Sequence, residues 1–339
     1  MLESCIRMLV ERQDLSTDMA REAMDAIMSG QATDAQIAGF LVALRMKGET
    51  VDEITGCAQA MRAAATPIDA GGLDVVDTCG TGGTRKGTLN VSTAVAFVVA
   101  GAGVPVAKHG NRAASASWGS ADVLEALGVN IEAEPAVVER CIREAGIGFL
   151  FAPALHKSMK FAIGPRRQLA IRTVFNILGP LTNPAGARRQ LLGVFADELV
   201  DPMARVLGNL GAVRAMVVHS ADGMDEISLC DETLVAEVED GAVTVRRMSP
   251  EDVGLPRAER DDLTVSGLAQ SVEAIRAVLG GRTGPWRDIV LLNAGAAIHV
   301  GGKAGDVADG IRSAAESVDS GRAREALNKL VEVSRQPAG

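Results

Sequence analysis

The stretch from residue 77 to residue 93 constrains the fold most, because it joins a short apolar strand to an apolar helix through clustered glycines. Glycines let backbone N–H groups converge on an anion, and the positive end of the helix dipole adds to the attraction. Asn90, Ser92 and Thr93 add amide and hydroxyl groups at the predicted helix start. The stretch therefore predicts a phosphate-binding loop after a strand.

Neither of the two common phosphate-binding motifs fits this loop. The dinucleotide fingerprint would require glycine where Arg85 stands, and the nucleotide P-loop would require lysine where Thr88 follows Gly87. A purely structural turn is the alternative interpretation. The polar groups at the helix start favour a binding loop over that alternative.

The order of the predicted elements indicates an α/β fold. Residues 2–66 show only helical patterns, with two capping boxes. From residue 67 onward, strands alternate with helices, which is typical of βαβ units and a mostly parallel sheet. Strands are expected at residues 73–78, 104–107, 148–151 and 216–219, and helices at 91–102, 121–127, 135–145 and from about 306 to 334. The dipeptide Asp240-Gly241 predicts a hairpin between Val-rich segments.

A basic cluster, residues 108–112, follows the strand expected at 104–107. Ligands of open α/β sheets bind beyond the carboxyl ends of the strands. Lys108 and Arg112 could neutralise a phosphate there, and Asn111 could hold a polar substrate group. Ser120 could cap the next helix. A solvated charged loop is the alternative interpretation.

An acidic cluster, residues 222–226, follows the strand expected at 216–219. The adjacent carboxylates of Asp225 and Glu226 suit Mg²⁺, which takes few protein ligands and is completed by waters and substrate phosphates. An acidic surface turn is the alternative, but this pair lies at the same predicted sheet edge as both phosphate candidates. Farther along the chain, Arg166 and Arg167 could each match a carboxylate bidentately.

Charge and cysteine content disfavour several classes of protein. The net charge of −9 argues against nucleic acid or an anionic membrane as a general partner. The five cysteines are far apart and odd in number, which predicts reduced thiols in a cytoplasm rather than a disulfide framework or metal site. His156 and His299 are expected to be structural. We assign no nucleophile and no general base.

Together, these segments resemble the anthranilate phosphoribosyltransferase family of tryptophan biosynthesis. The matching segments span nearly the whole chain: residues 80–83, 90–93, 108–113, 119–122, 172–184, 222–226, 291–295 and 319–321. The resemblance implies a small N-terminal helical domain (1–68, with a helical segment near 165–182) hinged to a large α/β domain (72–339). The large domain would have a mostly parallel central sheet with helices around it. A homodimer formed through the N-terminal helices is also implied.

The resemblance further implies a reaction, the second step of tryptophan biosynthesis from chorismate. Phosphoribose would pass from phosphoribosyl pyrophosphate (PRPP) to the amine of anthranilate, giving N-(5-phosphoribosyl)anthranilate and pyrophosphate, with Mg²⁺ as cofactor. By matching position, three sets of residues would bind these groups. They are Gly80, Gly83, Thr84, Thr88, Asn90, Val91, Ser92, Thr93, Lys108, Arg112 and Ser120 for PRPP; Gly80, Asn111 and Arg166 for anthranilate; and Ser92, Asp225 and Glu226 for Mg²⁺.

Two positions depart from the family pattern. Thr84 stands where the family usually has aspartate, so a carboxylate near the diphosphate and metal is missing. Ala116 stands where the family usually has serine, which removes one phosphate hydrogen bond, typically worth about 0.5–1.5 kcal/mol. Two other functions are kept as alternatives: a pyrimidine nucleoside phosphorylase, which shares the architecture, and a non-catalytic paralogue that binds nucleic acid.

Overall fold

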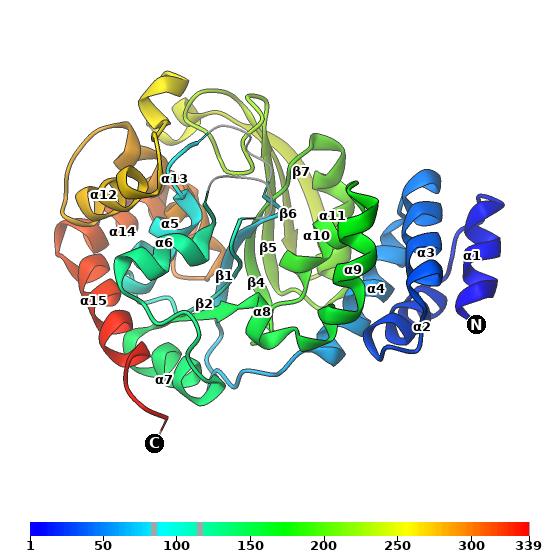
Figure 1. Cartoon of the computed structure of the whole chain (residues 1–339). Coiled ribbons are helices and arrows are strands. Elements are labelled where there is room, and N and C mark those ends of the chain that lie inside the picture. The colour runs from blue at the N-terminus through cyan, green and yellow to red at the C-terminus, as the bar shows by residue number, and fades with distance from the viewer. Residues whose placement is uncertain (83–86, 114–117, 339) are drawn as a thin grey trace.

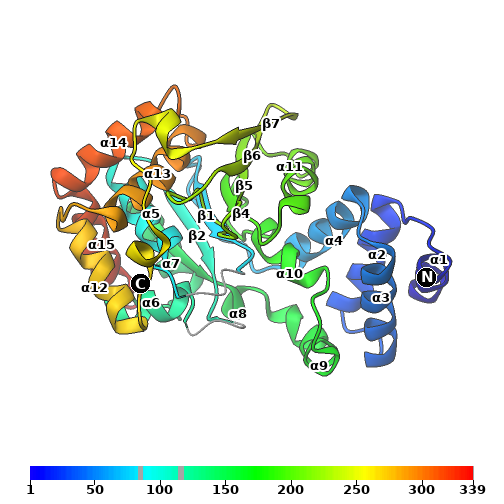
Figure 2. The same cartoon turned by 90° about the horizontal axis from the view of Figure 1, so that it is seen from above.

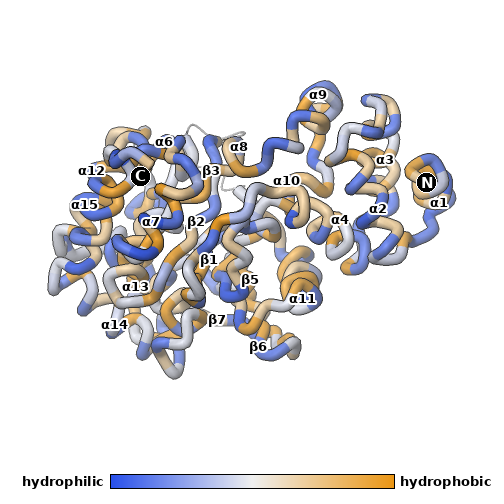
Figure 3. The backbone as a smooth tube through the Cα atoms, turned by 90° about the horizontal axis from the view of Figure 1, so that it is seen from below, coloured by the Kyte–Doolittle hydropathy of each residue, from blue (hydrophilic) through white to orange (hydrophobic). Residues whose placement is uncertain are grey.

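Four helices form a bundle at the N-terminus of the computed structural model, which describes residues 1–82, 87–113 and 118–338 (Figures 1 and 2). They are α1 (Leu2–Val10), α2 (Thr17–Met28), α3 (Asp34–Lys47) and α4 (Val51–Ala64). Capping boxes at Thr33 and Thr50 begin α3 and α4, as predicted. These helices alternate between hydrophilic and hydrophobic residues (Figure 3), and the hydrophobic ones form the bundle core.

A seven-stranded sheet forms the centre of the rest of the chain, in the order β3-β2-β1-β4-β5-β6-β7. The strands are β1 (Val76–Gly80), β2 (Val106–Gly110), β3 (Ile147–Phe151), β4 (Arg189–Gly193), β5 (Arg214–Ser220), β6 (Thr233–Glu239) and β7 (Ala242–Met248). The first five in sequence are parallel, and β6 and β7 are antiparallel. Asp240 and Gly241 join β6 to β7 with φ values of 47° and 83°, so the predicted hairpin is confirmed.

The strands differ from the sequence prediction in extent and in one omission. β1 and β2 lie two or more residues farther along the chain than expected, whereas β3 and β5 overlap their expected ranges closely. β4 is absent from the prediction. It has only five residues and follows a turn-rich segment, yet it occupies the middle of the sheet between β1 and β5.

Helices cover both faces of the sheet (Figure 2). One side of the sheet is covered by α5 (Val91–Gly101), α6 (Ser120–Leu127), α12 (Leu268–Leu279), α13 (Pro285–Val300), α14 (Val307–Asp319) and α15 (Arg322–Ser334). Helix α7 (Pro135–Ala145) packs beside β3. Helix α11 (Val200–Asn209) packs against β5 and β6. Successive residues of β4 belong to different cores: Leu191 packs with the α5 and α13 side, and Leu192 with the α11 side. This three-layer arrangement confirms the α/β class with a mostly parallel sheet.

The bundle shares its hydrophobic core with the α11 face of the sheet. α8 (Ala152–Leu155), α9 (Lys160–Leu169) and α10 (Phe175–Leu178) follow β3, and α9 packs against α2 and α3. The 3₁₀ helices are η1 (Lys157–Met159), η2 (Gly179–Leu181), η3 (Asp197–Leu199), η4 (Pro250–Val253) and η5 (Arg260–Leu263). Arg62 of α4 donates to the carbonyl oxygens of Leu181 (2.7 Å) and Leu210 (3.3 Å), which ties the bundle to the larger part. None of the described helices has the length and apolarity needed to cross a bilayer.

Candidate active site

The strand order reverses between β1 and β4, so the chain leaves their carboxyl ends in opposite directions. In open α/β sheets a crevice for ligands forms at such a point. Gly80 at the end of β1 is paired with Gly193 at the end of β4. The described parts of three loops lie at this edge: the glycine loop (81–82 and 87–90), the loop after β2, and the acidic loop (residues 221–227) that follows β5.

The glycine loop leads directly into the start of α5. Asn90 is the N-cap, and its side chain accepts a hydrogen bond from the backbone N–H of Thr93 at 3.2 Å. Thr88 lies before it, Val91 is buried, and Ser92 is half-buried. The Oγ1 atoms of Thr81 and Thr93 are buried with no hydrogen-bond partner among the described residues. Buried polar atoms are normally satisfied, so these hydroxyls indicate a place for a ligand. Gly83 and Thr84 lie outside the described residues.

The acidic loop crosses the ends of β1 and β4. The Oδ2 atom of Asp225 accepts a hydrogen bond from the backbone N–H of Gly82 at 3.1 Å. A Cβ on Gly80 would stand 2.7 Å from Asp225 Oδ2, and one on Gly193 would overlap the Asp225 carbonyl oxygen. The acidic loop can therefore take this path only because both strands end in glycine. Sequence reasoning missed Gly193, although a glycine ending an apolar strand was a usable signal.

Glu226 places a carboxylate inside this site. Its Oε2 atom is buried and has no hydrogen-bond partner among the described residues. Burial raises the pKa of Glu226 well above its usual range, and the charges of Asp225 and Asp222 raise it further, whereas Lys108 lowers it. An isolated buried carboxylate is costly, so this oxygen suits a cation that arrives with the ligand. Among the described residues no set of three or more His, Cys, Asp or Glu side chains forms a complete metal cage.

Lys108 lies beneath the start of α5. Lys108 is a residue of β2, and its side chain is buried. Its Nζ atom donates to the Thr78 carbonyl at 2.5 Å and to Ser92 Oγ at 3.2 Å. Burial lowers the pKa of Lys108, while the nearby charge of Asp77 opposes that shift. Lys108 thus places a buried hydrogen-bond donor under the helix start, where it supports Ser92.

The loop after β2 departs from expectation at two side chains. α6 has Gly119 as its N-cap, and Asp122 accepts from the Gly119 N–H at 2.7 Å, so the expectation that Ser120 caps α6 is wrong. Ser120 Oγ instead donates to the Asn111 carbonyl at 3.4 Å. The guanidinium of Arg112 binds the carboxylates of Asp122 (2.7 Å) and Glu125 (2.9 Å) on α6. A phosphate contact by Arg112 would require it to give up one of these carboxylates.

Arg166 on α9 carries an uncompensated positive charge. Its guanidinium lies over the ring of Phe175 at 4.9 Å and forms no ion pair with any described carboxylate. Partial burial lowers the pKa of Arg166 from its usual value. A half-buried arginine that stacks on an aromatic ring and lacks an anionic partner is suited to bind a carboxylate ligand.

A buried histidine pair joins the end of β2, which contains His109, to the C-cap of α8, His156, and sequence reasoning did not connect its members. The Nε2 atoms of His109 and His156 are 3.2 Å apart. Burial and then the neighbouring His156 lower the pKa of His109 to about 3, and burial lowers the pKa of His156 to about 4, so both rings are neutral at physiological pH. Asp77 accepts from the His109 N–H (3.0 Å) and from Asn183 Nδ2 (2.8 Å). His299 is also structural, because it contacts the Ala304 carbonyl and Glu237.

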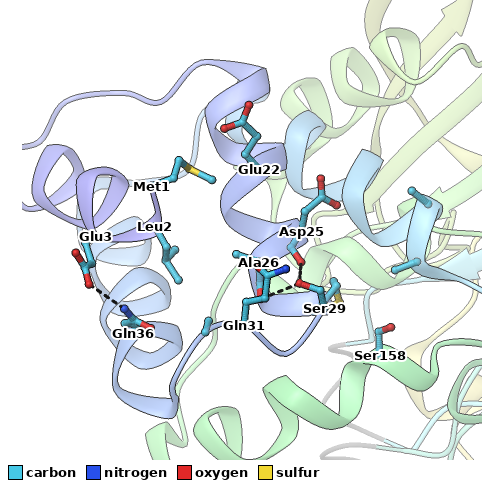
Figure 4. Close-up of a pocket in the computed structure, with 14 residues that line it drawn as sticks. Met1, Leu2, Glu3, Glu22, Asp25, Ala26, Ser29, Gln31, Gln36 and Ser158 are labelled. Carbon is cyan, nitrogen blue, oxygen red and sulfur yellow. Dashed lines mark hydrogen bonds between the residues drawn. The ribbon is translucent and has the colours of Figure 1, made fainter.

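A separate hollow of about 830 Å³ lies in the helical bundle (Figure 4). Glu3, Glu22 and Asp25 line it, and Glu3 accepts a hydrogen bond from Gln36 at 3.2 Å. Its carboxylates repel anions, so this hollow does not suit a phosphorylated ligand. The site at the sheet edge is the better candidate.

Comparisons with known proteins cover both parts of the chain. The family described as "Glycosyl transferase family, helical bundle domain" matches residues 3–65, and "Glycosyl transferase family, a/b domain" matches residues 72–324. An anthranilate phosphoribosyltransferase of Thioalkalivibrio sulfidiphilus is 54% identical over 97% of this chain and 98% of its own length. One of Geobacter sp. (strain M21) is 54% identical over 99% of each chain.

Solved structures of such enzymes share the whole fold. The anthranilate phosphoribosyltransferase of Thermus thermophilus superimposes with a TM-score of 0.93 at 44% identity, covering 98% of this chain and 99% of the other. The Saccharomyces cerevisiae enzyme in complex with PRPP and Mg gives a TM-score of 0.88 at 27% identity, covering 98% and 97%.

Proposed function

The chain belongs to the anthranilate phosphoribosyltransferases, and from this premise we propose how its residues divide the reaction. The enzyme transfers 5-phosphoribose from PRPP to the amine of anthranilate and releases pyrophosphate, the second step of tryptophan biosynthesis. Nucleoside phosphorolysis and nucleic-acid binding are not retained, because the relatives that match over the whole chain share the transferase name.

We propose that PRPP lies in the crevice between β1 and β4. The N-terminus of α5 and the backbone of the glycine loop would bind its phosphates. The buried hydroxyls of Thr81 and Thr93, which have no partner among the described residues, support this placement, as does the buried Lys108 Nζ donor beneath Ser92. Gly80, Gly83, Thr84, Thr88, Asn90, Val91, Arg112 and Ser120 stay in the proposed site on the resemblance.

Mg²⁺ fits the same place. The buried Oε2 atom of Glu226, which has no hydrogen-bond partner in the part of the chain that the structure describes, supports a cation there. Asp225 and Ser92 offer further oxygens. Few protein ligands are needed, because Mg²⁺ usually keeps waters and substrate phosphates. When bound, it would neutralise and orient the pyrophosphate group.

The chemistry breaks the bond between the anomeric carbon and the pyrophosphate oxygen, and the electron pair leaves with pyrophosphate. The anthranilate nitrogen supplies the pair for the new C–N bond and then loses a proton. Positive charge builds on the sugar while negative charge builds on the leaving group. The helix start and Lys108 stabilise that developing negative charge, so no enzyme nucleophile is required.

Arg166 would hold the anthranilate carboxylate, and Asn111 and the backbone at Gly80 would complete that subsite. The observation that carries this assignment is the half-buried guanidinium over Phe175, with no ion-pair partner among the described carboxylates. Anthranilate is an anion with a flat ring, so it matches a planar cation in a partly buried place.

Replacing Arg166 by alanine tests this assignment. Hydrogen bonds to charged groups contribute about 1.5–3 kcal/mol, so the KM for anthranilate should rise roughly 10- to 100-fold. The KM for PRPP should change little. The measurement is the loss of anthranilate fluorescence at varied concentrations of each substrate. Arg167→Ala is the matched control, because Arg167 is the exposed neighbour on α9. Equal increases in both KM values would contradict the role.

We also propose a cytoplasmic homodimer formed through the bundle, with residues 1–68 and a segment near 165–182 as the helical domain and residues 72–339 as the α/β domain. Val10, Met46 and Ile163 support a contact there, since each is a large hydrophobic side chain exposed on α1, α3 or α9. The five free cysteines support a reducing compartment. Sedimentation velocity would reject the dimer if the chain stays monomeric at micromolar concentration.

A further inference from the structure

Residues 258–271 form contacts with both the acidic loop and the glycine loop. The reaction outlined above gives these residues no role. We name this segment the strap. It contains η5 and leads into α12, and in Figure 1 it is the yellow-to-gold chain that runs into that helix. Its contacts lie at two places on the candidate site.

At one end the strap holds the acidic loop. The Ala258 N–H donates to the Leu229 carbonyl at 3.1 Å, and the guanidinium of Arg260 donates to the Asp222 carbonyl at 2.6 Å. Asp222 itself organises the turn, since its carboxylate accepts from the Met224 N–H at 3.0 Å and from Ser228 Oγ at 2.8 Å. Arg260 therefore fixes the residue that shapes the turn carrying Asp225 and Glu226.

At the other end the strap runs antiparallel to the glycine loop. The Val265 N–H donates to the Gly87 carbonyl at 2.7 Å, and the Leu89 N–H donates to the Leu263 carbonyl at 3.3 Å. Farther on, the buried hydroxyl of Ser271 accepts from the Asn90 N–H at 3.4 Å. The strap thus reaches the N-cap residue of α5.

Gly87 shows how tightly the strap fits the loop. A Cβ there would stand 2.8 Å from the Val265 carbonyl oxygen and 3.0 Å from the indole ring of Trp118. Gly87 is therefore packed between the strap and the residue before the N-cap of α6. No larger residue fits without moving one of these segments.

We propose that the strap sets the distance between the phosphate-binding and metal-binding halves of the site, with Arg260 as the positioning residue at its acidic end. The proposal rests on the function proposed above. Arg260 has a buried Nε with no hydrogen-bond partner among the described residues and forms no ion pair with a described carboxylate. Within the described part of the chain, Arg260 donates its hydrogen bond to the Asp222 carbonyl, so that contact is where its half-buried side chain is held.

The kinetic test compares Arg260→Ala with wild type at varied PRPP, anthranilate and Mg²⁺. Loosening the acidic loop should raise the KM for PRPP and the half-saturating Mg²⁺ concentration at least tenfold, while the KM for anthranilate stays within twofold. Arg260→Lys should recover part of the loss, because an ammonium can still donate to the Asp222 carbonyl. Arg276→Ala is the matched control, since Arg276 is exposed on the helix that follows.

A binding readout separates positioning from turnover. The chain has two tryptophans, and Trp118 lies against Gly87. In a Trp286→Phe background, Trp118 fluorescence should report PRPP binding in the presence of Mg²⁺. Trp286 Nε1 has no hydrogen-bond partner among the described residues, so its replacement breaks none. Arg260→Ala should move the midpoint of this titration at least tenfold higher.

Arg260→Ala kinetics equal to those of Arg276→Ala would overturn the proposal. So would equal increases in both KM values, which indicate general loosening of the enzyme. If Arg260→Ala does not fold, Ser271→Ala tests the opposite end and should raise the KM for PRPP selectively. Failure of the wild-type chain to bind PRPP would contradict the proposed function. Normal PRPP binding by wild type together with unchanged PRPP binding by Arg260→Ala would contradict only the role of the strap.

Discussion

At two positions in this site, the absence of a side chain matters as much as the chemical groups present at other positions. Glycines at 80 and 193 end adjacent strands and let the acidic loop pass directly over them. Side chains at either position would displace Asp225, which the Gly82 N–H already holds at 3.1 Å. Two uncharged glycines therefore determine where the acidic residues of the site lie.

Gly193→Ala tests this dependence. The new Cβ would overlap the Asp225 carbonyl oxygen, so the acidic loop must move. Misplacing groups that stabilise developing charge typically lowers turnover by roughly 100-fold or more, and the half-saturating Mg²⁺ concentration should rise as well. Steady-state rates across a Mg²⁺ series measure both effects.

The control for that substitution is Gly208→Ala on α11. A Cβ at Gly208 would have its nearest neighbour at 3.8 Å, an ordinary contact, and alanine is the better helix former. Its kinetics should match wild type. If Gly193→Ala also matched wild type, the close approach of the acidic loop would have no functional weight.

At the scale of elements, the C-terminal end of β2 is anchored to the end of α8 by two neutral histidines. Their rings meet at 3.2 Å, and Asp77 links the His109 backbone to Asn183 on the segment after η2. The pair thus joins the loop that carries Asn111 to the chain that leads into α9 and Arg166. Both rings are neutral because burial lowers their pKa values, and protonating both would place two like charges in contact.

This pair predicts how stability depends on pH. In the folded chain the pKa values are about 3 and about 4, whereas an unfolded histidine titrates near 6.5. The unfolded chain therefore binds more protons between pH 6.5 and about 4, so the free energy of unfolding falls as pH falls through that window. Each ring contributes up to about 1.4 kcal/mol per pH unit.

His156→Gln isolates this contribution in urea denaturation at pH 7.5, 6.0 and 5.0. At pH 7.5 both rings are neutral in either state, so any difference from wild type there reports packing alone. Between pH 6.0 and 5.0 the variant should lose less stability than wild type. Parallel slopes for the two proteins would mean that the histidines do not set this dependence.

For the whole molecule, the site exists because the strand order reverses in the middle of the sheet. Segments near residues 80, 108 and 225 are far apart in sequence, yet parallel strands bring their ends to one edge. The bundle then carries α9 toward that edge, since α9 packs on α2 and α3. Arg166, which we propose binds the acceptor, thus comes from a different group of helices than the residues proposed to bind the donor.

Local patterns predicted that the glycine loop, the basic cluster and the acidic loop lie at one sheet edge, because each is a polar segment after an apolar run. Their ligand-binding roles stay predictions. The α/β class followed from alternating strand and helix patterns, the bundle from helical patterns with capping boxes, and the hairpin from the Asp240-Gly241 dipeptide. The sequence analysis did not predict β4, because a five-residue strand between turns is too short to show a recognisable strand pattern. The strap was not predicted because its contacts with Gly87 and Leu89 are made by backbone atoms, and such contacts do not depend on side-chain type. The capping role expected for Ser120 failed because Gly119 took that place.

The central claim is that PRPP and Mg²⁺ bind where the glycine loop, Lys108 and the acidic loop meet. A crystal structure of the full chain soaked with both tests it most directly. We expect the diphosphate against the start of α5 and the metal within coordination distance of the Glu226 carboxylate. A sugar phosphate bound away from β1 and β4, or a metal that touches neither Asp225 nor Glu226, would contradict the account.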